Sequence, residues 1–183
     1  MDTKALRQKI LDLAIRGKLV PQDPNDEPAS VLLERIRAEK QQMVKDGKLK
    51  PKDIKNDTVI FKDDDNLHYE KFSGGTVKCI EDEIPFDVPN NWEWCRFGSY
   101  TLNRDSERKP VSSVQRKKVK KIYDYYGASG VIDQTDSFLF DEELLLIGED
   151  GANLLARTKP IAFLADGKYW VNNHAHCIDS IDK

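Results

Sequence analysis

Histidine, cysteine and carboxylate side chains gather toward the C-terminal end of this sequence. The run His174-Ala175-His176-Cys177 contains residue types that bind metals, and Glu149-Asp150 adds two carboxylates. Carboxylates with histidines are the groups that metal-dependent hydrolysis of a phosphodiester uses. In an extended strand, however, His174 and His176 face one side and Cys177 faces the other. Two ligands do not make a zinc site, so we expect no bound metal.

Other catalytic motifs are missing from the sequence. It contains neither a Gly-x-x-x-x-Gly-Lys phosphate loop nor a Gly-x-Gly-x-x-Gly fingerprint. Ser129 lies in Gly127-Ala128-Ser129-Gly130, which is not a nucleophile elbow. We therefore expect no catalytic residue and no cofactor. A metal-dependent nuclease using Glu149, Asp150, His174 and His176 is the alternative.

One stretch of the sequence is strongly basic. Between Arg104 and Lys121 there are eight basic and two acidic residues, whereas residues 133–150 contain seven acidic and no basic ones. A basic loop beside a β-rich core could follow a phosphate backbone, and a solvated loop without a partner is the other interpretation. The candidate DNA-binding residues are Arg104, Arg108, Lys109, Arg116, Lys117, Lys118, Lys120 and Lys121.

Apolar runs around these groups predict a β-rich unit. Residues 144–147 and 161–164 have strand length and end in turn signals. Three blocks, 125–130, 144–153 and 169–177, lead from apolar residues into corners rich in Gly or Asn. We expect these corners to form the rim of the unit, where binding groups usually lie.

Two amphipathic helices are predicted near the N-terminus. The first begins with Thr3 as its cap and ends at Gly17, and the second begins with Pro28 and ends at Gly47. Two helices cannot bury both faces alone, so we expect an arm that docks on a partner. The predicted partner-binding residues are Leu6, Ile10, Leu13, Leu32, Ile36 and Met43.

The fold class predicted from these patterns is α+β. The helical arm covers residues 1–47, a polar linker with a loose hairpin covers 48–72, and the β-rich domain covers 73–183. A strand at 76–80 is expected to open that domain. The proline-stiffened segment 83–94 is expected to place Trp92 or Trp94 on the sheet.

Composition limits the classes of protein further. The chain has 183 residues, 33% of them charged, and a net charge of −3, which excludes coating of nucleic acid through overall charge. No apolar run approaches the roughly 18 residues of a membrane span, so we expect a cytoplasmic protein with no membrane contact. Three widely spaced cysteines indicate buried reduced thiols.

Several blocks in order resemble one known family. Residues 6–22, 27–29 and 32–36 resemble the conserved helical region of specificity (S) subunits of type I restriction-modification systems. Ile84-Pro85 with Asn91-Trp92-Glu93-Trp94 resembles the entry to their target recognition domain. Segments 126–130, 148–153 and 171–176 resemble motifs inside that domain, so the resemblance spans nearly the whole chain.

The resemblance implies a non-catalytic reader of double-stranded DNA. Its helices would hold methyltransferase (M) subunits, and restriction (R) subunits would be directed indirectly to the same site. The Gly and Asn motifs would be scaffold, and base readout would fall on Arg104, Arg108, Lys109, Arg116 and Lys117, with the other lysines on phosphates. An assembly module without DNA readout is a further alternative.

The family usually has two helical regions and two recognition domains, whereas this sequence has one of each. We therefore expect a fragment or a self-associating half-subunit, with a recognition domain that is incomplete at its C-terminal end.

Overall fold

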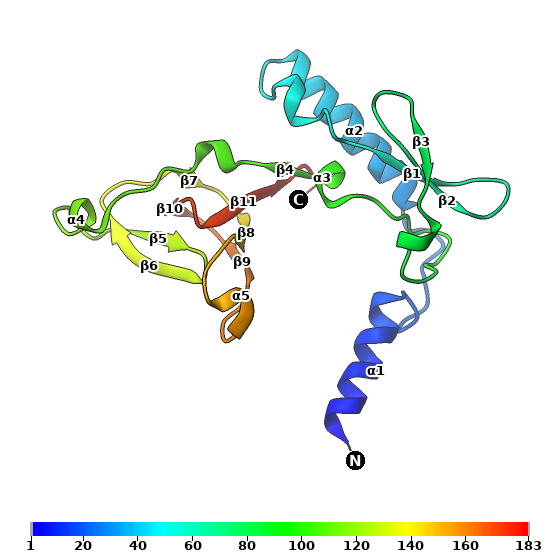
Figure 1. Ribbon diagram of the computed structural model, residues 1–183, viewed down its shortest axis with the longest axis horizontal. Coiled ribbons are helices and arrows are strands. Elements are labelled where there is room, and N and C mark those ends of the chain that lie inside the picture. The colour runs from blue at the N-terminus through cyan, green and yellow to red at the C-terminus, as the bar shows by residue number, and fades with distance from the viewer. Residues whose placement is uncertain (1, 183) are drawn as a thin grey trace. The chain divides into compact units, whose positions relative to one another are not determined.

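The computed structural model describes residues 2–182 and confirms the α+β class (Figure 1). It divides into two compact units between Tyr100 and Thr101. The first unit contains α1 (Thr3–Ile15), α2 (Ala29–Lys45), η1 (Pro51–Asp53), β1 (Val59–Lys62), β2 (His68–Lys71), β3 (Val77–Cys79), η2 (Glu81–Glu83) and α3 (Phe97–Tyr100). The second contains β4 (Thr101–Asn103), η3 (Asp105–Glu107), α4 (Ser113–Arg116), β5 (Tyr123–Gly127), β6 (Gly130–Thr135), β7 (Phe140–Asp141), β8 (Leu144–Gly148), α5 (Asn153–Ala156), β9 (Ala162–Ala165), β10 (Lys168–Val171) and β11 (Ala175–Ser180).

Helix α1 leaves its apolar side chains in solvent. Asp2, not the predicted Thr3, caps the helix, because its carboxylate accepts hydrogen bonds from the amides of Lys4 and Ala5. Gly17 follows the helix with a φ of 62°, as its predicted place at the end requires. No residue of α1 is buried, and Leu6 and Ile10 are 43% and 44% exposed. Across the described residues, no helix is both long enough and apolar enough to cross a membrane.

The end of α1 packs on the proline-rich segment. A Cβ at Gly17 would lie 2.6 Å from a ring carbon of Pro89, and the guanidinium of Arg16 stacks over Phe86 at 4.7 Å. The indole of Trp92 donates a hydrogen bond to Gln22 (2.8 Å). The indole of Trp92 thus meets the segment that follows α1, and the place of Trp92 or Trp94 on the sheet of the β-rich domain stays a prediction.

Helix α2 is held by a buried cation. Lys40 is 1% exposed, and its ammonium donates to the carboxylate of Asp57 (3.0 Å) and to the carbonyl of Gly98 (2.8 Å). Burial raises the pKa of Asp57, and the hydrogen bond from Lys40 opposes that shift. Ile36, one turn earlier on α2, is 1% exposed. Its predicted contact with a partner protein is corrected, because the first unit already buries this side chain.

The polar segment after α2 folds into a sheet. Strands β1, β2 and β3 are antiparallel in that order, which confirms the hairpin. The third strand joins this sheet instead of opening the β-rich domain. Arg96 binds Glu70 (2.5 Å) and the Thr58 amide binds Ser99 (2.9 Å), so segments on both sides of residue 73 are tied together. The compact units therefore divide at residue 100, later than the predicted boundary at 73.

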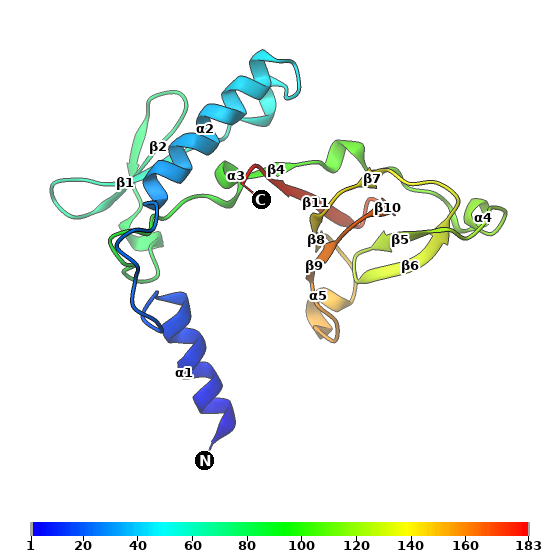
Figure 2. The same cartoon turned by 180° about the vertical axis from the view of Figure 1, so that it is seen from behind.

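Two four-stranded sheets form the second unit. Their orders are β6-β5-β10-β7 and β4-β11-β8-β9, and β10 pairs with β5 in parallel while the other pairs are antiparallel. Figures 1 and 2 show β8 and β11 side by side in this unit. The alternate side chains that face inward form one core: Phe140, Leu144, Leu146, Ala165, Tyr169, Val171, Ala175 and Cys177. The predicted strands at 144–147 and 161–164 are thus confirmed as β8 and, one residue later, β9.

The cysteines carry free thiols, but only one is buried. Cys177 lies in the core of the second unit, and burial raises the pKa of its thiol to about 12. Cys95 is half-buried and Cys79 is exposed. The prediction of reduced thiols holds, whereas the prediction of general burial is wrong for Cys79.

The Gly148→Ala substitution tests the packing between the corners of the second unit. A Cβ at position 148 would lie 2.4 Å from the carbonyl oxygen of Ala128, an atom that the backbone holds in place. We expect the free energy of unfolding to fall by about 1–3 kcal/mol, the usual effect of overpacking, in urea titrations followed by circular dichroism. Gly74→Ala is the control, because its Cβ would meet nothing within 4 Å. Equal stability of the two variants would contradict this packing.

Candidate nucleic-acid interface

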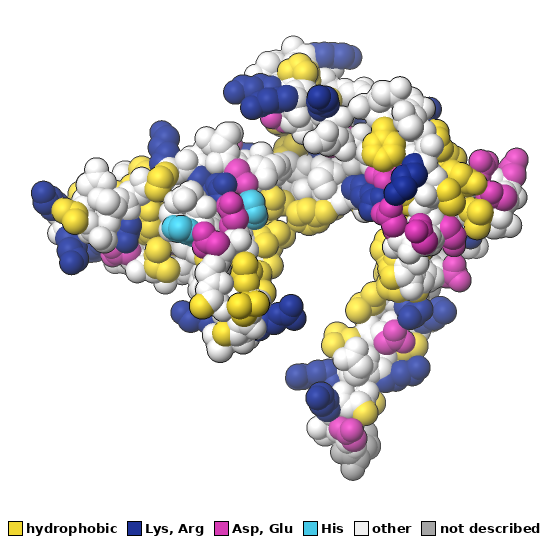
Figure 3. Space-filling view, viewed as in Figure 1, with side chains coloured by type: hydrophobic (Ala, Val, Ile, Leu, Met, Phe, Trp, Pro, Cys, Tyr) yellow, Lys and Arg dark blue, Asp and Glu magenta, His cyan; other side chains and the backbone are white. Residues whose placement is uncertain are grey.

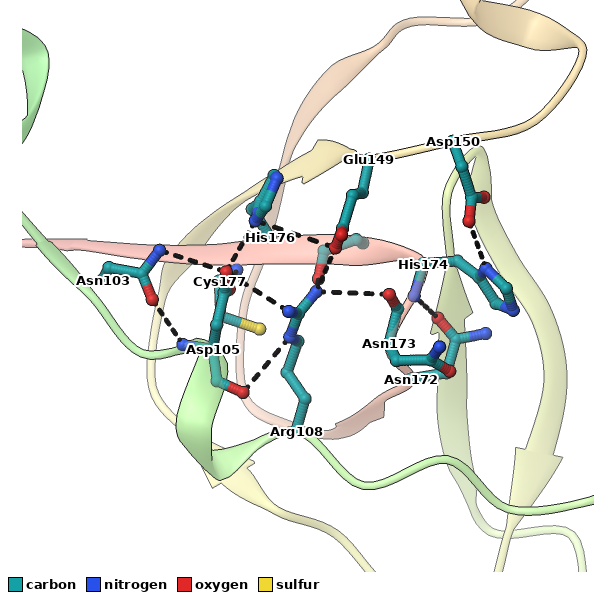
Figure 4. Close-up of polar contacts among 11 residues, drawn as sticks. Asn103, Asp105, Arg108, Glu149, Asp150, Asn172, Asn173, His174, His176 and Cys177 are labelled. Atoms are coloured by element: carbon teal, nitrogen blue, oxygen red, sulfur yellow. Dashed lines mark hydrogen bonds and ion pairs between the residues drawn. The ribbon is translucent and has the colours of Figure 1, made fainter.

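A network of charged groups fixes the start of the basic stretch to the strands beneath it (Figure 4). Asp105 accepts a hydrogen bond from the amide of Cys177 (2.8 Å), and its other oxygen lies 2.6 Å from Nδ1 of His176. Burial raises the pKa of Asp105, but hydrogen bonds from Cys177, His176 and Asn103 outweigh it and leave the pKa below its ordinary value. The carboxylate is therefore ionised at neutral pH and anchors η3 to β11.

Arg108 occupies the centre of this network. Its Nη1 donates to Glu149 (2.8 Å) and to the carbonyl of Ala175 (2.8 Å), and its Nη2 lies 3.3 Å from Asp105. The side chain is only 13% exposed. Arg108 thus ties η3 to the ends of β8 and β11, and its prediction as a DNA-contacting residue is corrected, because its guanidinium already has internal partners.

The residues of the nuclease alternative form two pairs. Nδ1 of His176 lies 3.8 Å from Glu149 and 2.6 Å from Asp105, whereas Nδ1 of His174 lies 2.6 Å from Asp150. Glu149 also binds the Arg108 guanidinium (2.8 Å). Within residues 2–182, no three His, Cys, Asp or Glu side chains form a group that could hold a metal ion.

The Asn motifs hold turns. Asn172 is 5% exposed, and its side chain accepts a hydrogen bond from the amide of His174 (2.8 Å). Asn153 bonds the backbone amide and carbonyl of Lys159, both at 3.0 Å. These contacts agree with the scaffold role that the resemblance implies.

The basic stretch itself is ordered by contacts at both ends. Its start is fixed where the Lys109 carbonyl accepts a hydrogen bond from the indole of Trp170 (2.6 Å). Ser112 caps α4 through the amide of Gln115 (3.2 Å). At its end, the amide of Ile122 donates to the carbonyl of Thr135 (3.0 Å). The segment from Lys109 to Lys121 is therefore an ordered loop that contains the helical turn α4.

Two other arginines of the stretch also have internal partners. Arg116 binds Asp133 (2.7 Å), donates to the carbonyl of Val111 and stacks over Tyr125 at 4.4 Å. Arg104 pairs with Glu107, Glu142 and Asp179. These arginines position the loop, so their assignment to base readout is corrected. Lys121 also binds Asp133 (2.7 Å), and together with Arg116 it lowers the pKa of that carboxylate.

Four lysines of the predicted set remain exposed. Their side chains have no ion pair among the residues that the structure describes: Lys109, Lys117, Lys118 and Lys120. Figure 3 shows Lys and Arg side chains gathered at the end of the second unit that carries α4. We call these four residues the lysine row. The row presents positive charge from a loop whose backbone is fixed by the arginines.

Sequence reasoning missed a second cationic group, on the loop that follows α5. Arg157 and Lys159 are exposed there, beside the fully exposed Leu155. The run from residue 151 to 165 contains both cations and no acidic residue. The sequence shows this excess of basic residues, but the two carboxylates of Glu149-Asp150 directly precede it and balance it when the charges of both segments are counted together.

Comparison with known proteins supports the resemblance over part of the chain. Over about half of its length, the chain is related to specificity subunits of type I restriction enzymes, which confirms the resemblance. It is 42% identical over 111 residues to the EcoEI specificity subunit of Escherichia coli (61% of this chain, 15% of that protein). It is 46% identical over 95 residues to the EcoAI specificity subunit of the same organism (52% and 13%).

A more distant relative belongs to the same class. A putative type I restriction enzyme specificity subunit of Haemophilus influenzae is 35% identical over 91 residues (50% of this chain, 23% of that protein). The aligned part is less than a quarter of the length of each of these relatives. No family model matches the chain, and no solved structure matches it.

Acidification of the Asp105→Asn variant tests the network. The folded carboxylate has a lowered pKa, so its stabilisation is fully present above the unfolded pKa of about 3.9 and is lost as the pH falls through the folded pKa. We expect the stability difference between wild type and Asp105→Asn to be largest near pH 7 and to shrink below about pH 4. Urea titrations across pH measure it.

Asp166→Asn is the control for that experiment. Asp166 accepts only from the amide of the adjacent Gly167 (2.7 Å), which an asparagine can replace. A pH-independent difference between wild type and Asp105→Asn would contradict the assigned role of the carboxylate.

Proposed function

We propose that this chain is a sequence-specific DNA-binding specificity subunit, or part of one, that directs methyltransferase subunits and, through them, restriction subunits to a target site. The observation that carries the proposal is the lysine row, whose charge the structure leaves uncompensated. The names of the relatives support the same class.

Electrostatics supports duplex DNA as the ligand of the lysine row. The chain has a net charge of −3, so any affinity for phosphates must come from a local surface. Arginine guanidinium groups satisfy the nearby carboxylates of Asp133 and Glu149, which leaves the lysine ammonium groups free to contact phosphates. In this proposal Lys117, Lys118 and Lys120 contact phosphates, and Lys109, nearest the anchored start of the loop, approaches a base edge.

The contacts of Glu149, Asp150, His174 and His176 agree with a protein that recognises DNA without cleaving it. Glu149, a carboxylate that the nuclease alternative needs, binds the Arg108 guanidinium, and within the described residues no three His, Cys, Asp or Glu side chains form a group that could hold a metal ion. We therefore assign the methylation and cleavage chemistry to partner subunits.

Helix α1 is the proposed docking element for the methyltransferase. Its exposed leucines and isoleucines find no apolar cover in the first unit, although such side chains gain free energy when buried. Of the predicted set, Leu6, Ile10 and the half-buried Leu13 lie on α1, while Leu32 and Met43 of α2 are half-buried. We propose that α1 carries most of this contact.

A second copy, or the remainder of a longer protein, would supply another recognition unit. The aligned segment amounts to 13–23% of the length of the curated relatives, so this chain accounts for a part of such a protein. Self-association as a half-subunit is one way to complete it.

Replacement of three residues of the lysine row tests DNA binding. Replacing Lys117, Lys118 and Lys120 with Ala removes three phosphate-neutralising charges, so the slope of log Kobs against log salt concentration is expected to become shallower by about 2.7. Fluorescence anisotropy of a labelled duplex, enriched from a random pool by the wild-type chain, measures the slope.

The matched control removes the same charge elsewhere. Lys48, Lys52 and Lys55 are exposed lysines of the first unit, and replacing them with Ala should leave the slope within error of wild type. If both triple variants change the slope equally, only net charge matters, and the lysine row is not the interface.

Charged substitutions on α1 test the docking of the methyltransferase. The double variant Leu6→Glu and Ile10→Glu places two carboxylates on the apolar face, and we expect co-purification with the methyltransferase to fall at least tenfold, because a buried unpaired charge costs several kcal/mol. The control, Thr3→Glu with Gln8→Glu, adds the same charge on exposed polar positions. Unchanged capture by the Leu6 and Ile10 variant would remove α1 from the interface.

A further inference from the structure

The tip of the second unit carries an apolar residue that folding does not explain. Leu155, on α5, is 92% exposed, and its neighbour Leu154 is 36% exposed. Burial of a leucine side chain stabilises a fold, but Leu155 is exposed and therefore contributes nothing to the core. Figure 3 shows hydrophobic and Lys or Arg side chains lying together at the end of the unit that carries α5.

The loop that presents Leu155 is rigidly built. The side chain of Asn153 accepts hydrogen bonds from the amide of Lys159 (3.0 Å) and the hydroxyl of Thr158 (3.2 Å), and it donates to the carbonyl of Lys159 (3.0 Å). Arg157 has a φ of 49° and donates its amide to the carbonyl of Asn153 (2.8 Å). A left-handed non-glycine residue persists only where the surroundings hold it, so the exposed leucine is fixed in place.

The charged residues near Leu155 indicate which class of ligand this surface suits. Arg157 and Lys159 follow Leu155 closely in the sequence, are exposed and have no ion pair among the described residues. The two preceding carboxylates are engaged elsewhere, Glu149 by Arg108 (2.8 Å) and Asp150 by His174 (2.6 Å). The surface therefore combines an apolar point with two cations and few competing negative charges. A duplex offers the matching surface, since phosphates line a groove whose base-pair steps accept an apolar side chain.

We propose that Leu155 is a wedge that enters a base-pair step of bound duplex DNA, while Arg157 and Lys159 hold the phosphates on either side of it. This inference rests on the proposed DNA-binding function and adds a second contact, distinct from the lysine row. Insertion of the wedge bends the duplex, so the site favours sequences whose steps unstack easily.

The test compares bending with binding. The full chain is mixed with a duplex that it has enriched from a random pool, labelled with a fluorophore at each end. Wild type is expected to shorten the end-to-end distance measured by energy transfer. Leu155→Ala is expected to abolish this change and to weaken binding about ten- to hundredfold, the range that corresponds to burial of a leucine side chain. Leu155→Phe keeps a large apolar side chain at this position, so this variant should bend the duplex as wild type does.

Two further variants complete the experiment. Arg157→Ala with Lys159→Ala should make the salt dependence shallower by about 1.8 in log Kobs against log salt concentration. Val131→Ala, a control that trims another exposed apolar residue of the second unit (48% exposed), should bend and bind as wild type does.

Each outcome decides between defined alternatives. If Leu155→Ala bends and binds the duplex as wild type does, the wedge is overturned while the DNA-binding function stands. If that variant instead loses capture of the methyltransferase with DNA binding unchanged, the tip is a protein contact and the wedge is overturned as well. If the wild-type chain binds no duplex, the proposed function fails and the wedge fails with it.

Discussion

The second unit depends on one half-buried cation at the junction of its loops and strands. Arg108 joins the Asp105 carboxylate of η3, the Glu149 carboxylate beyond β8 and the Ala175 carbonyl of β11. Removing one member of this cluster leaves the other charges without their partner, at a cost that solvent reduces on the side of Glu149, whose side chain is 41% exposed. The junction also fixes where the basic loop leaves the sheet.

The first unit uses the same physical device for another purpose. Lys40 of α2 reaches Asp57 before the three-stranded sheet and the carbonyl of Gly98 after it, so one ammonium joins α2 to residues 17 and 58 positions later in the chain. Among the described residues of the first unit, Ile36 and Ile80 are the fully buried apolar side chains, and ion pairs such as Arg96 with Glu70 add to the contacts of this small core. In both units a buried or half-buried cation orders a segment whose composition suggests a linker.

The basic residues of the second unit divide into two groups by chemistry. Arginine presents several donors in a planar fork, which suits simultaneous contacts with carboxylates and carbonyls. Arg108 and Arg116 each contact a carboxylate and a carbonyl, and Arg104 contacts three carboxylates. Lysine has a flexible stem and a compact charge, and the lysine row remains in solvent. Positioning by arginine and attraction by lysine together give a fixed, positively charged surface on a chain with a net negative charge.

Sequence alone determined the local elements and the family resemblance. Apolar periodicity and turn residues are local signals, so they predicted both helices, the hairpin, strands β8 and β9 and the Gly and Asn corners. Three outcomes depended on distant contacts and could not be predicted: the pairing of the predicted strand at 76–80 with the first sheet, the burial of Ile36 and the internal pairing of the arginines. Arg104 meets Asp179 75 residues away and Arg108 meets Glu149 41 residues away. Only the tertiary structure brings these charges together, because the local sequence around an arginine does not indicate which distant carboxylate the fold places beside it.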